Sequence, residues 1–265
     1  MSIKKVVLFP NLKKKGVKKA ISFLKKRLKE KKIKIEKEIS SQSDLVIAIG
    51  GDGTILKAAR EIKNGKTLLL GVNLGEVGFL TTTTLERLNE SLNEILTNNF
   101  FISPRLMLKV QVRRNATSRQ NCFCLNEVVL MRRDPRVLSL KILGRKGKIG
   151  EFCVDGLIIA TPTGSTGHSL SAGGPLVFPE EEIIILTPIC SVSLASRPLI
   201  LSANEELRIE IDSPDANLTI DGQKNFLLKR KDLLLVRRSP FSLKLIDTSR
   251  KGYFRLLQEK LGWLP

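Results

Sequence analysis

The sequence is poor in residues that build metal or disulfide frameworks. It has four cysteines and one histidine in 265 residues, so a Cys/His zinc site is not expected. Cys122 and Cys124 lie two apart in a strand-like stretch and are predicted to point the same way, as apolar fillers. Near the start, the only apolar run is Val6–Phe9, which is too short for a secretory signal. These scarcities predict a cytoplasmic protein.

Aromatic residues and long apolar stretches are also scarce. One Trp and one Tyr, without interleaved basic residues, give no surface on which RNA bases would stack. A nucleic-acid partner is therefore not expected. No apolar stretch approaches the ~20 residues of a membrane-spanning helix, so a membrane partner is not expected either. With 42% hydrophobic and 27% charged residues, the composition is that of a globular protein and excludes a disordered chain.

Positive charge, by contrast, is abundant. The formal net charge is +19, and thirteen Lys or Arg residues lie between Lys13 and Lys37, beside only two acidic ones. In the same segment apolar residues recur at helical spacing, at Val17, Ile21, Leu24 and Leu28. The pattern predicts a helix that packs on a core and turns its lysines outward. A solvated face is therefore favoured over a surface that binds a polyanion.

Two different periodicities divide the chain near residue 100. Apolar runs such as Leu45–Ile49 and Thr67–Val72 alternate with helical patterns, which predicts an N-terminal α/β domain with a parallel sheet over residues 1–100. Consecutive strand-like stretches then predict a β-rich domain over residues 101–239, antiparallel and sandwich-like. Those expected first are Leu106–Val112, Cys122–Met131, Val137–Leu143 and Val154–Ala160. A tail over about 240–265 is expected to pack back on one of the domains.

A glycine-rich turn, Gly50-Gly51-Asp52-Gly53-Thr54, follows the buried strand Leu45–Ile49. Ligands of open α/β sheets bind beyond the carboxyl ends of the strands, and glycines let backbone N–H groups approach an anion. Thr54 is predicted to cap the following helix. Asp52 would be repelled by a phosphate unless it holds a metal or accepts a proton. The alternative is an ordinary glycine turn with an Asx bond.

A hydroxyl-rich stretch, Thr161–Pro175, follows Asp155-Gly156 and the apolar strand Leu157–Ala160. Seven hydroxyl or imidazole groups and four glycines suit the wrapping of a polar ligand better than a core. The alternative is a solvated loop, although a long structureless loop inside a compact domain is usually functional. His168 in this stretch is equally compatible with a pocket wall and with a general base.

Two further segments are weaker candidates. Asn126-Glu127 interrupts an apolar strand and suits pairing with ribose hydroxyls, but a satisfied edge-strand pair is equally compatible. The loop Asn73–Leu80 leaves the next strand, so it is placed to flank the glycine turn, with Phe79 either stacking on a base or packing in the core. Asp44, Asp134 and Asp221 are interpreted as turn formers.

Taken together these segments resemble the NAD kinase family. The resemblance spans most of the chain and rests on Gly50–Thr54, Asn73–Phe79, Asn126-Glu127, Asp155-Gly156, Thr161–Thr166, Ser171–Pro175, Leu186–Cys190 and Ser196–Pro198. The glycine turn is shared with diacylglycerol kinases, sphingosine kinases and phosphofructokinases, whereas the hydroxyl-rich stretch is far more specific. A lipid kinase of that superfamily and, as a non-enzyme, a basic nucleic-acid-binding protein are the alternatives.

The resemblance implies transfer of a phosphoryl group from ATP, or another phosphoryl donor, to the 2′-hydroxyl of the adenosine ribose of NAD, giving NADP. It implies a divalent metal such as Mg²⁺, a homo-oligomer (dimer or tetramer), a site between the domains and a tail packed on the first domain. Asp52 is then the catalytic carboxylate. We favour a general base, because a ribose hydroxyl is a poor nucleophile, with metal contact as the alternative role.

The remaining site residues follow by position from the same resemblance. The ATP phosphates are assigned to Gly50, Gly51, Gly53 and Thr54. NAD is assigned to Asp52, Gly53, Phe79, Asn126, Glu127, Asp155, Thr163, Thr166, Gly167, His168, Ser169, Leu170, Ser171 and Gln223. The chain departs from the family in having Gly167-His168 for the usual Ala-Tyr and Ser191-Val192 for the usual Pro-His. The choices of NAD or NADH and of ATP or polyphosphate stay open.

Overall fold

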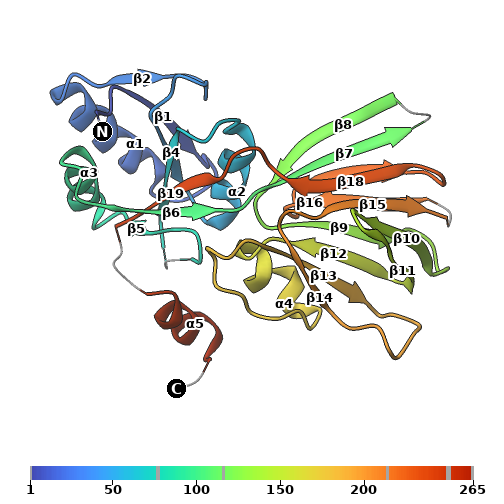
Figure 1. Cartoon of the computed structure of the whole chain (residues 1–265). Helices are drawn as coiled ribbons and strands as arrows, with labels where there is room; N and C mark the ends of the chain where they lie inside the picture. Colours follow the sequence, from blue (N-terminus) through green and yellow to red (C-terminus); the bar gives the residue numbers. More distant parts are fainter. Residues whose placement is uncertain (1, 76–77, 115–116, 213–214, 249–251, 264–265) are drawn as a thin grey trace. The chain divides into compact units, whose positions relative to one another are not determined.

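The computed structural model of the chain describes residues 2–75, 78–114, 117–212, 215–248 and 252–263. Parts of two predicted segments lie outside the described residues, namely Glu76 and Val77 of the loop Asn73–Leu80 and residues 249–251 and 264–265 of the tail. The chain forms two compact units (Figure 1). The first comprises residues 1–104 and 242–265, and the second comprises residues 105–241.

The first unit is built on a seven-stranded sheet with the order β2-β1-β3-β4-β19-β6, to which β5 adds beside β4. Its strands are β1 (Lys5–Pro10), β2 (Lys34–Glu36), β3 (Leu45–Ile49), β4 (Leu68–Asn73), β5 (Thr83–Thr84), β6 (Phe101–Arg105) and β19 (Leu243–Asp247). The pairs β1–β2, β1–β3, β3–β4 and β4–β19 are parallel. Buried on both faces, β3 is wholly apolar, as expected for the centre of a parallel sheet.

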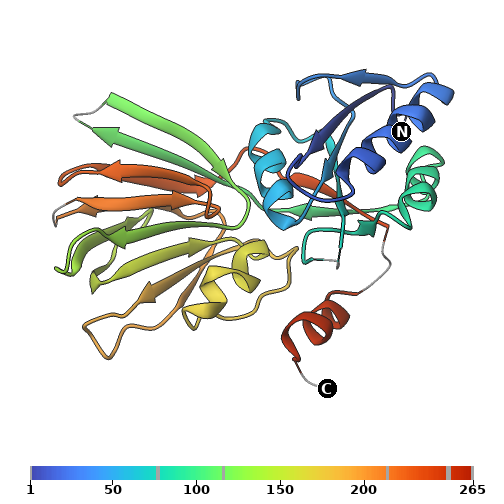
Figure 2. The same cartoon turned by 180° about the vertical axis from the view of Figure 1, so that it is seen from behind.

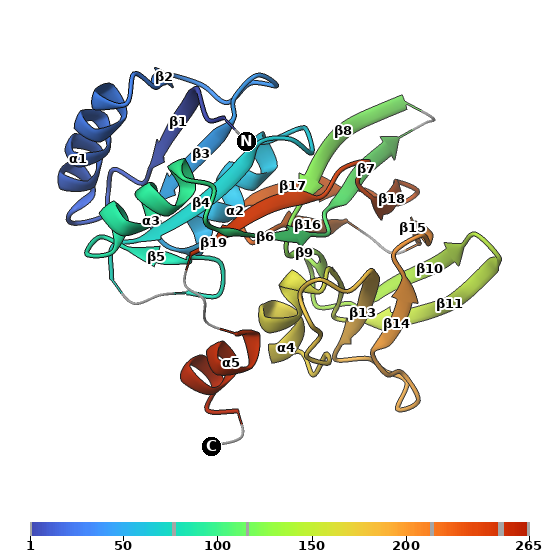
Figure 3. The same cartoon turned by 60° about the vertical axis from the view of Figure 1, so that its left-hand side comes forward.

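Helices cover both faces of this sheet (Figure 3). They are α1 (Val17–Glu30), α2 (Asp52–Glu61) and α3 (Leu88–Leu96), while α5 (Tyr253–Leu261) follows the last strand of the unit. The apolar sides of α1 and α3 share one core with β1, β3 and β4. On the opposite face Ile55 of α2 lies so close to Gly71 that a Cβ at position 71 would approach its Cδ1 to 2.3 Å. Helices on both faces explain why these strands are apolar throughout.

Helix α1 has the amphipathic character predicted from the basic segment. Val17, Leu24 and Leu28 are fully buried, and the lysines of α1 are exposed. Among the residues described, no helix combines the length and the apolar composition needed to cross a membrane.

The second unit contains two six-stranded antiparallel sheets, ordered β11-β10-β15-β18-β7-β8 and β14-β13-β12-β9-β16-β17. The strands are β7 (Leu108–Arg114), β8 (Thr117–Cys124), β9 (Glu127–Arg132), β10 (Leu138–Gly144), β11 (Gly147–Val154), β12 (Gly156–Ala160), β13 (Ile183–Ile189), β14 (Leu199–Ser202), β15 (Glu206–Ile211), β16 (Ala216–Ile220), β17 (Lys224–Leu228) and β18 (Leu233–Arg238). Inward side chains of both sheets form one core, as in a sandwich. The predicted fold class, parallel α/β followed by antiparallel β, is confirmed.

Two stretches predicted as single strands are each divided. Cys122–Met131 is split between β8 and β9, which lie in different sheets, and the chain crosses at Leu125-Asn126. Val154–Ala160 is split between the end of β11 and β12, again in different sheets. Both errors have one cause: an apolar run continues through a corner when the residues on both sides of it face the same core. Cys124 is buried in that core and Cys122 packs against it, as predicted.

The hydroxyl-rich stretch is not an open loop. It forms a 3-10 turn, η1 (Thr163–Thr166), and a short helix, α4 (His168–Ser171), seen in Figure 2 beside the sheet that contains β12 and β13. Ala172 and Val177 pack with Ile158 and Ile185 on the face of that sheet away from the sandwich core. The segment therefore covers apolar surface while it presents polar groups at its start.

Candidate functional site

The glycine turn joins β3 to α2, and Asp52 is the first residue of that helix. The N-cap is Gly51, in extended conformation and without a side-chain cap, so the prediction that Thr54 caps the helix is wrong. The helix begins two residues before Thr54, whose N–H donates to the Gly51 carbonyl at 2.8 Å. A Cβ at Gly50 would lie 2.2 Å from Thr54 Oγ1, so this close turn requires glycine there.

The Asp52 carboxylate is held by the loop that follows β4. Its Oδ2 accepts the Phe79 N–H at 2.9 Å, and its Oδ1 accepts the Leu80 N–H at 3.2 Å. Gly78 packs directly on the carboxylate, since a Cβ there would lie 2.2 Å from Oδ1. The structure thus brings together the glycine turn after β3 and the loop after β4, which the sequence placed on neighbouring strands. Phe79, beside Asp52, is half-buried.

Burial raises the pKa of Asp52 above its ordinary value, although backbone hydrogen bonds to Leu80, Phe79 and Thr81, and the charge of Lys260, act in the opposite direction. The carboxylate is therefore a stronger proton acceptor than a solvated aspartate, and its orientation is fixed by the amides that it accepts. This combination suits a general base more than a passive turn residue.

A second group of polar side chains gathers in the other unit, at the corner between β8 and β9. Two buried oxygens here, Asn126 Oδ1 and Glu127 Oε2, have no hydrogen-bond partner among the described residues, and the same is true of Thr163 Oγ1 in the hydroxyl-rich stretch. The Thr161 N–H donates to the Asn126 carbonyl at 2.8 Å, which joins the start of the hydroxyl-rich stretch to this corner. Buried oxygens without donors are costly unless a ligand supplies the hydrogen bonds.

Small residues of the hydroxyl-rich stretch permit the close packing at this corner. A Cβ at Gly164 would lie 2.2 Å from the Asn126 carbonyl oxygen, and one at Gly167 would lie 3.1 Å from Glu127 Oε2. Burial, and next the negative charge of Asp221, raise the pKa of Glu127 from its usual 4.5 to about 7. Its carboxyl group is thus partly protonated near neutral pH and can accept or donate a hydrogen bond.

Asp221 forms a turn, as predicted, and its side chain also holds the backbone of this corner. It and Gly222 have φ values of 49° and 62°, as a tight hairpin turn between β16 and β17 requires. Its side chain, however, is only 3% exposed and accepts the N–H groups of Leu125 at 3.1 Å and Asn126 at 2.8 Å. The Asp-Gly signal predicted the turn correctly, but nothing local in the sequence shows the partners of the carboxylate.

Several hydroxyls of the predicted NAD-binding stretch bond within the unit. Ser169 Oγ lies 2.9 Å from Thr187 Oγ1, and Thr166 Oγ1 donates to the Thr163 carbonyl at 3.4 Å. Ser169 is buried, whereas His168 and Ser171 are exposed, and Thr166, Gly167 and Leu170 are half-buried. The polar groups of this stretch that lack partners are therefore fewer than its composition suggests.

Two other predicted site residues lie elsewhere in the same unit. Asp155 sits between β11 and β12, where its Oδ1 lies 3.0 Å from Arg132 Nε in an ion pair. Gln223 is exposed on the turn that Asp221 and Gly222 form.

Within the described residues, no group of three or more His, Cys, Asp or Glu side chains could hold a metal ion. A hard cation such as Mg²⁺ would have to take most of its ligands from a bound phosphate chain and water, with one carboxylate at most from the glycine turn.

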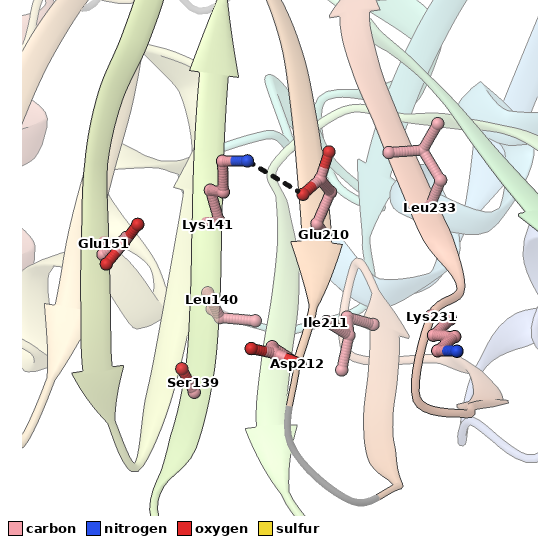
Figure 4. A pocket seen from close by; sticks show the side chains of 9 residues that line it. All are labelled: Ser139, Leu140, Lys141, Glu151, Glu210, Ile211, Asp212, Lys231 and Leu233. Carbon is pink, nitrogen blue, oxygen red and sulfur yellow. Dashed lines mark ion pairs between the residues drawn. The ribbon is translucent and has the colours of Figure 1, made fainter.

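A cavity of about 510 Å³ lies on the sheet β11-β10-β15-β18-β7-β8 of the second unit, and none of the predicted site residues lines it (Figure 4). Its walls mix basic Lys141 and Lys231 with acidic Glu151, Glu210 and Asp212, and Lys141 Nζ lies 3.4 Å from Glu210 Oε2. Near-balanced charge and an internal ion pair do not favour a polyanionic ligand there.

Comparison with known proteins assigns both parts of the chain to one family. The ATP-NAD kinase N-terminal domain matches residues 10–100, and the ATP-NAD kinase C-terminal domain matches residues 125–248. The NAD kinase of Caldanaerobacter subterraneus subsp. tengcongensis is 40% identical over 235 residues, covering 88% of this chain and 83% of the relative. That of Geotalea daltonii is 38% identical over 229 residues, covering 85% and 81%.

Solved structures give the same fold at lower identity. The yeast NADH kinase complexed with NADH superposes with a TM-score of 0.91 at 24% identity, covering all of this chain and 89% of that one. The NAD kinase from Archaeoglobus fulgidus in complex with ATP superposes with a TM-score of 0.74 at 24% identity, covering 97% of both chains.

We predict that Gly78→Ala destabilises the protein, whereas Gly75→Ala does not. The new methyl group at position 78 would overlap the Asp52 carboxylate, but at position 75 nothing lies within 4 Å. Overpacking of this kind costs about 1–3 kcal/mol of unfolding free energy, measurable by urea denaturation. Equal stability of the two variants would contradict the described seat of Asp52.

We also predict that Glu127→Gln removes a pH-dependent loss of stability. The pKa of Glu127 rises from 4.5 to about 7 on folding, so the native state keeps a proton that the unfolded chain releases. The corresponding stability is present below about pH 4.5 and is lost as the pH rises through about 7. Glutamine has no such proton, so the variant should gain roughly 1–3 kcal/mol relative to the parent between about pH 5 and about pH 8.

Urea denaturation at both pH values measures this difference, and the exposed Glu181→Gln serves as the control. The same change in both variants would show that Glu127 does not titrate in this way.

Proposed function

The chain belongs to the NAD kinase family, and we propose that it transfers a phosphoryl group from ATP to the 2′-hydroxyl of the adenosine ribose of NAD, giving NADP. The observation that carries this proposal is the Asp52 carboxylate, partly buried at the carboxyl end of a parallel strand and aimed by two backbone amides. That position is where open α/β sheets bind their ligands.

Asp52 is the proposed general base. A ribose hydroxyl gives up its proton only at high pH, so the transfer needs a positioned acceptor in the transition state. Burial raises the pKa of Asp52, which strengthens it as an acceptor, and the amides of Phe79 and Leu80 fix its direction. Contact with a metal ion is the alternative role for the same carboxylate.

The phosphates of ATP are assigned to the turn before α2. The amide of Gly50 donates to the Val72 carbonyl at 2.9 Å and that of Thr54 to the Gly51 carbonyl, so both are already used. We place the phosphate at the N-terminal end of the ten-residue helix α2. There the helix dipole favours an anion, and nothing lies within 4 Å of a Cβ built at Gly51.

A divalent metal, Mg²⁺ or similar, is part of the proposal. The residues present fit an ion that arrives on ATP and contacts at most Asp52, because the described residues provide no cluster of three ligands. When bound, the ion would spread the charge of the phosphates during transfer. Asp52 would then hold either the ion or the hydroxyl proton.

NAD is assigned chiefly to the corner at Asn126 and Glu127. Asn126 Oδ1, Glu127 Oε2 and Thr163 Oγ1 lack partners in the part of the chain that the structure describes, and ribose hydroxyls and the adenine amine are donors of the kind that they need. The assignments of Thr166, Gly167, His168, Leu170, Ser171, Asp155 and Gln223 to NAD remain part of this proposal. For Ser169 a backbone or packing contact is favoured, since its hydroxyl pairs with Thr187.

The proposal extends to the oligomeric state and the cellular compartment of the enzyme. Val192, Leu194 and Ile200 are 64%, 89% and 52% exposed, and apolar side chains of this kind support self-association as a dimer or tetramer. Among the described residues none of the four cysteines forms a disulfide, which agrees with work in a reducing cytoplasm.

We expect purified protein supplied with NAD, ATP and Mg²⁺ to form NADP, measured with an NADP-specific dehydrogenase. Parallel reactions with NADH and with inorganic polyphosphate define the acceptor and the donor. Failure to phosphorylate either dinucleotide with either donor would reject the proposal. Phosphorylation of diacylglycerol in liposomes instead would favour the lipid kinase alternative.

We predict that Asp52→Asn lowers kcat at least 10²-fold and leaves the affinity for NAD within about threefold, because the amide keeps the shape but accepts no proton. Initial rates and calorimetric titration with NAD measure the two effects. The control is Asp215→Asn, which removes a carboxylate that is 40% exposed and should leave both values unchanged. Normal turnover by Asp52→Asn would exclude the role of base.

A further inference from the structure

The backbone at Leu125 and Asn126 lies between two strands of different sheets. Strand β8 ends at Cys124, which pairs with Leu108, and β9 begins at Glu127, which pairs with Ala160. The amides of the two residues between them therefore fall outside both ladders. Each donates instead to Asp221, at 3.1 and 2.8 Å to Oδ1, and Cys124 Sγ lies 3.2 Å from the same atom.

Asp221 is tied to this corner from its own side as well. Its backbone N–H donates to the Glu127 carbonyl at 2.9 Å, so the main chains of the β16–β17 turn and of β9 are joined directly. The side chain is only 3% exposed. The backbone from which Asn126 and Glu127 extend is thus held in place by one buried carboxylate, that of Asp221 at the turn between β16 and β17.

We propose that Asp221 is a positioning residue, which accepts the Leu125 and Asn126 amide hydrogens and so fixes the backbone from which Asn126 and Glu127 meet NAD. The proposal deepens the function proposed above and rests on it for the identity of the ligand. Asp221 itself makes no contact with substrate in this role.

The same carboxylate also acts on Glu127 through its charge. Its Coulombic repulsion adds to burial in raising the pKa of Glu127. The described neighbours that approach this corner from the hydroxyl-rich stretch, Gly164 and Gly167, are uncharged. Replacement of Asp221 by a neutral residue should therefore move the titration of Glu127 to lower pH.

The test compares Asp221→Asn and Asp221→Ala with the same changes at Asp232. Asp232 is also a buried carboxylate, 1% exposed, and accepts a backbone N–H, that of Lys229 at 2.8 Å. It pairs with Arg114, at the end of β7 opposite to Leu108, which is the residue beside the corner. Each pair of variants thus makes the same chemical change in the same unit, but only the change at Asp221 alters the corner.

Two measurements on the free proteins come first and need no activity. Hydrogen exchange of the Leu125 and Asn126 amides should accelerate at least tenfold in Asp221→Ala, which removes the acceptor oxygen that asparagine would keep. The acceleration should exceed any change in global stability, and exchange should stay as in the parent in Asp232→Ala. The carboxyl signal of Glu127, assigned with Glu127→Gln, should titrate at lower pH in Asp221→Asn only.

Kinetics then test the consequence for binding. In Asp221→Ala the KM for NAD should rise about 10- to 100-fold, while the KM for ATP changes less than about twofold. Unchanged exchange or an unchanged KM for NAD in Asp221→Ala, unchanged titration in Asp221→Asn, or equal effects of the same change at Asp221 and Asp232 would each overturn the proposal. If the parent protein forms no NADP, the proposed function fails instead, and the exchange and titration results still decide whether Asp221 holds the corner.

Discussion

Both candidate sites depend on a carboxylate that is removed from water and held by backbone N–H groups outside the helices and ladders. Asp52 accepts the amides of Phe79 and Leu80, and Asp221 accepts those of Leu125 and Asn126. In each case the acid and the loop satisfy one another, because a buried charge and an unpaired buried amide are both costly alone. The geometry of the site is therefore set by main chain as much as by side chains.

The two acids differ in what surrounds them. Burial raises the pKa of Asp52 while amides and the charge of Lys260 offset it, so the group is poised to take a proton. Asp221 instead transmits its charge to Glu127, whose pKa rises to about 7. One carboxylate is suited to chemistry and the other to holding a neighbour. Because Asp221 holds the backbone of the corner, the corner stays in place although three buried side-chain oxygens have no partner among the described residues.

The departures from the family pattern have a local meaning in this arrangement. Gly167 stands where the family has alanine, and a Cβ there would approach Glu127 Oε2 to 3.1 Å. The following residue, His168, is exposed rather than packed against the corner. The glycine thus gives Glu127 slightly more room, and the imidazole replaces a phenol at the surface of the same segment.

The sequence by itself determined the layers of the fold and the chemical type of the site. Runs such as Leu45–Ile49 are long and apolar because helices cover both faces of their sheet, and alternation marks the sandwich, so both patterns can be read from neighbouring residues. The glycine turn and the hydroxyl-rich stretch likewise carry their chemistry in consecutive positions. Tertiary structure alone decided where Cys122–Met131 breaks into two strands and which hydroxyls, such as that of Ser169, are already hydrogen-bonded. It also decided that Asp221 accepts the Asn126 N–H. Those features join residues far apart in the chain, up to 96 positions in the case of Leu125 and Asp221, and local pattern holds no information about such partners.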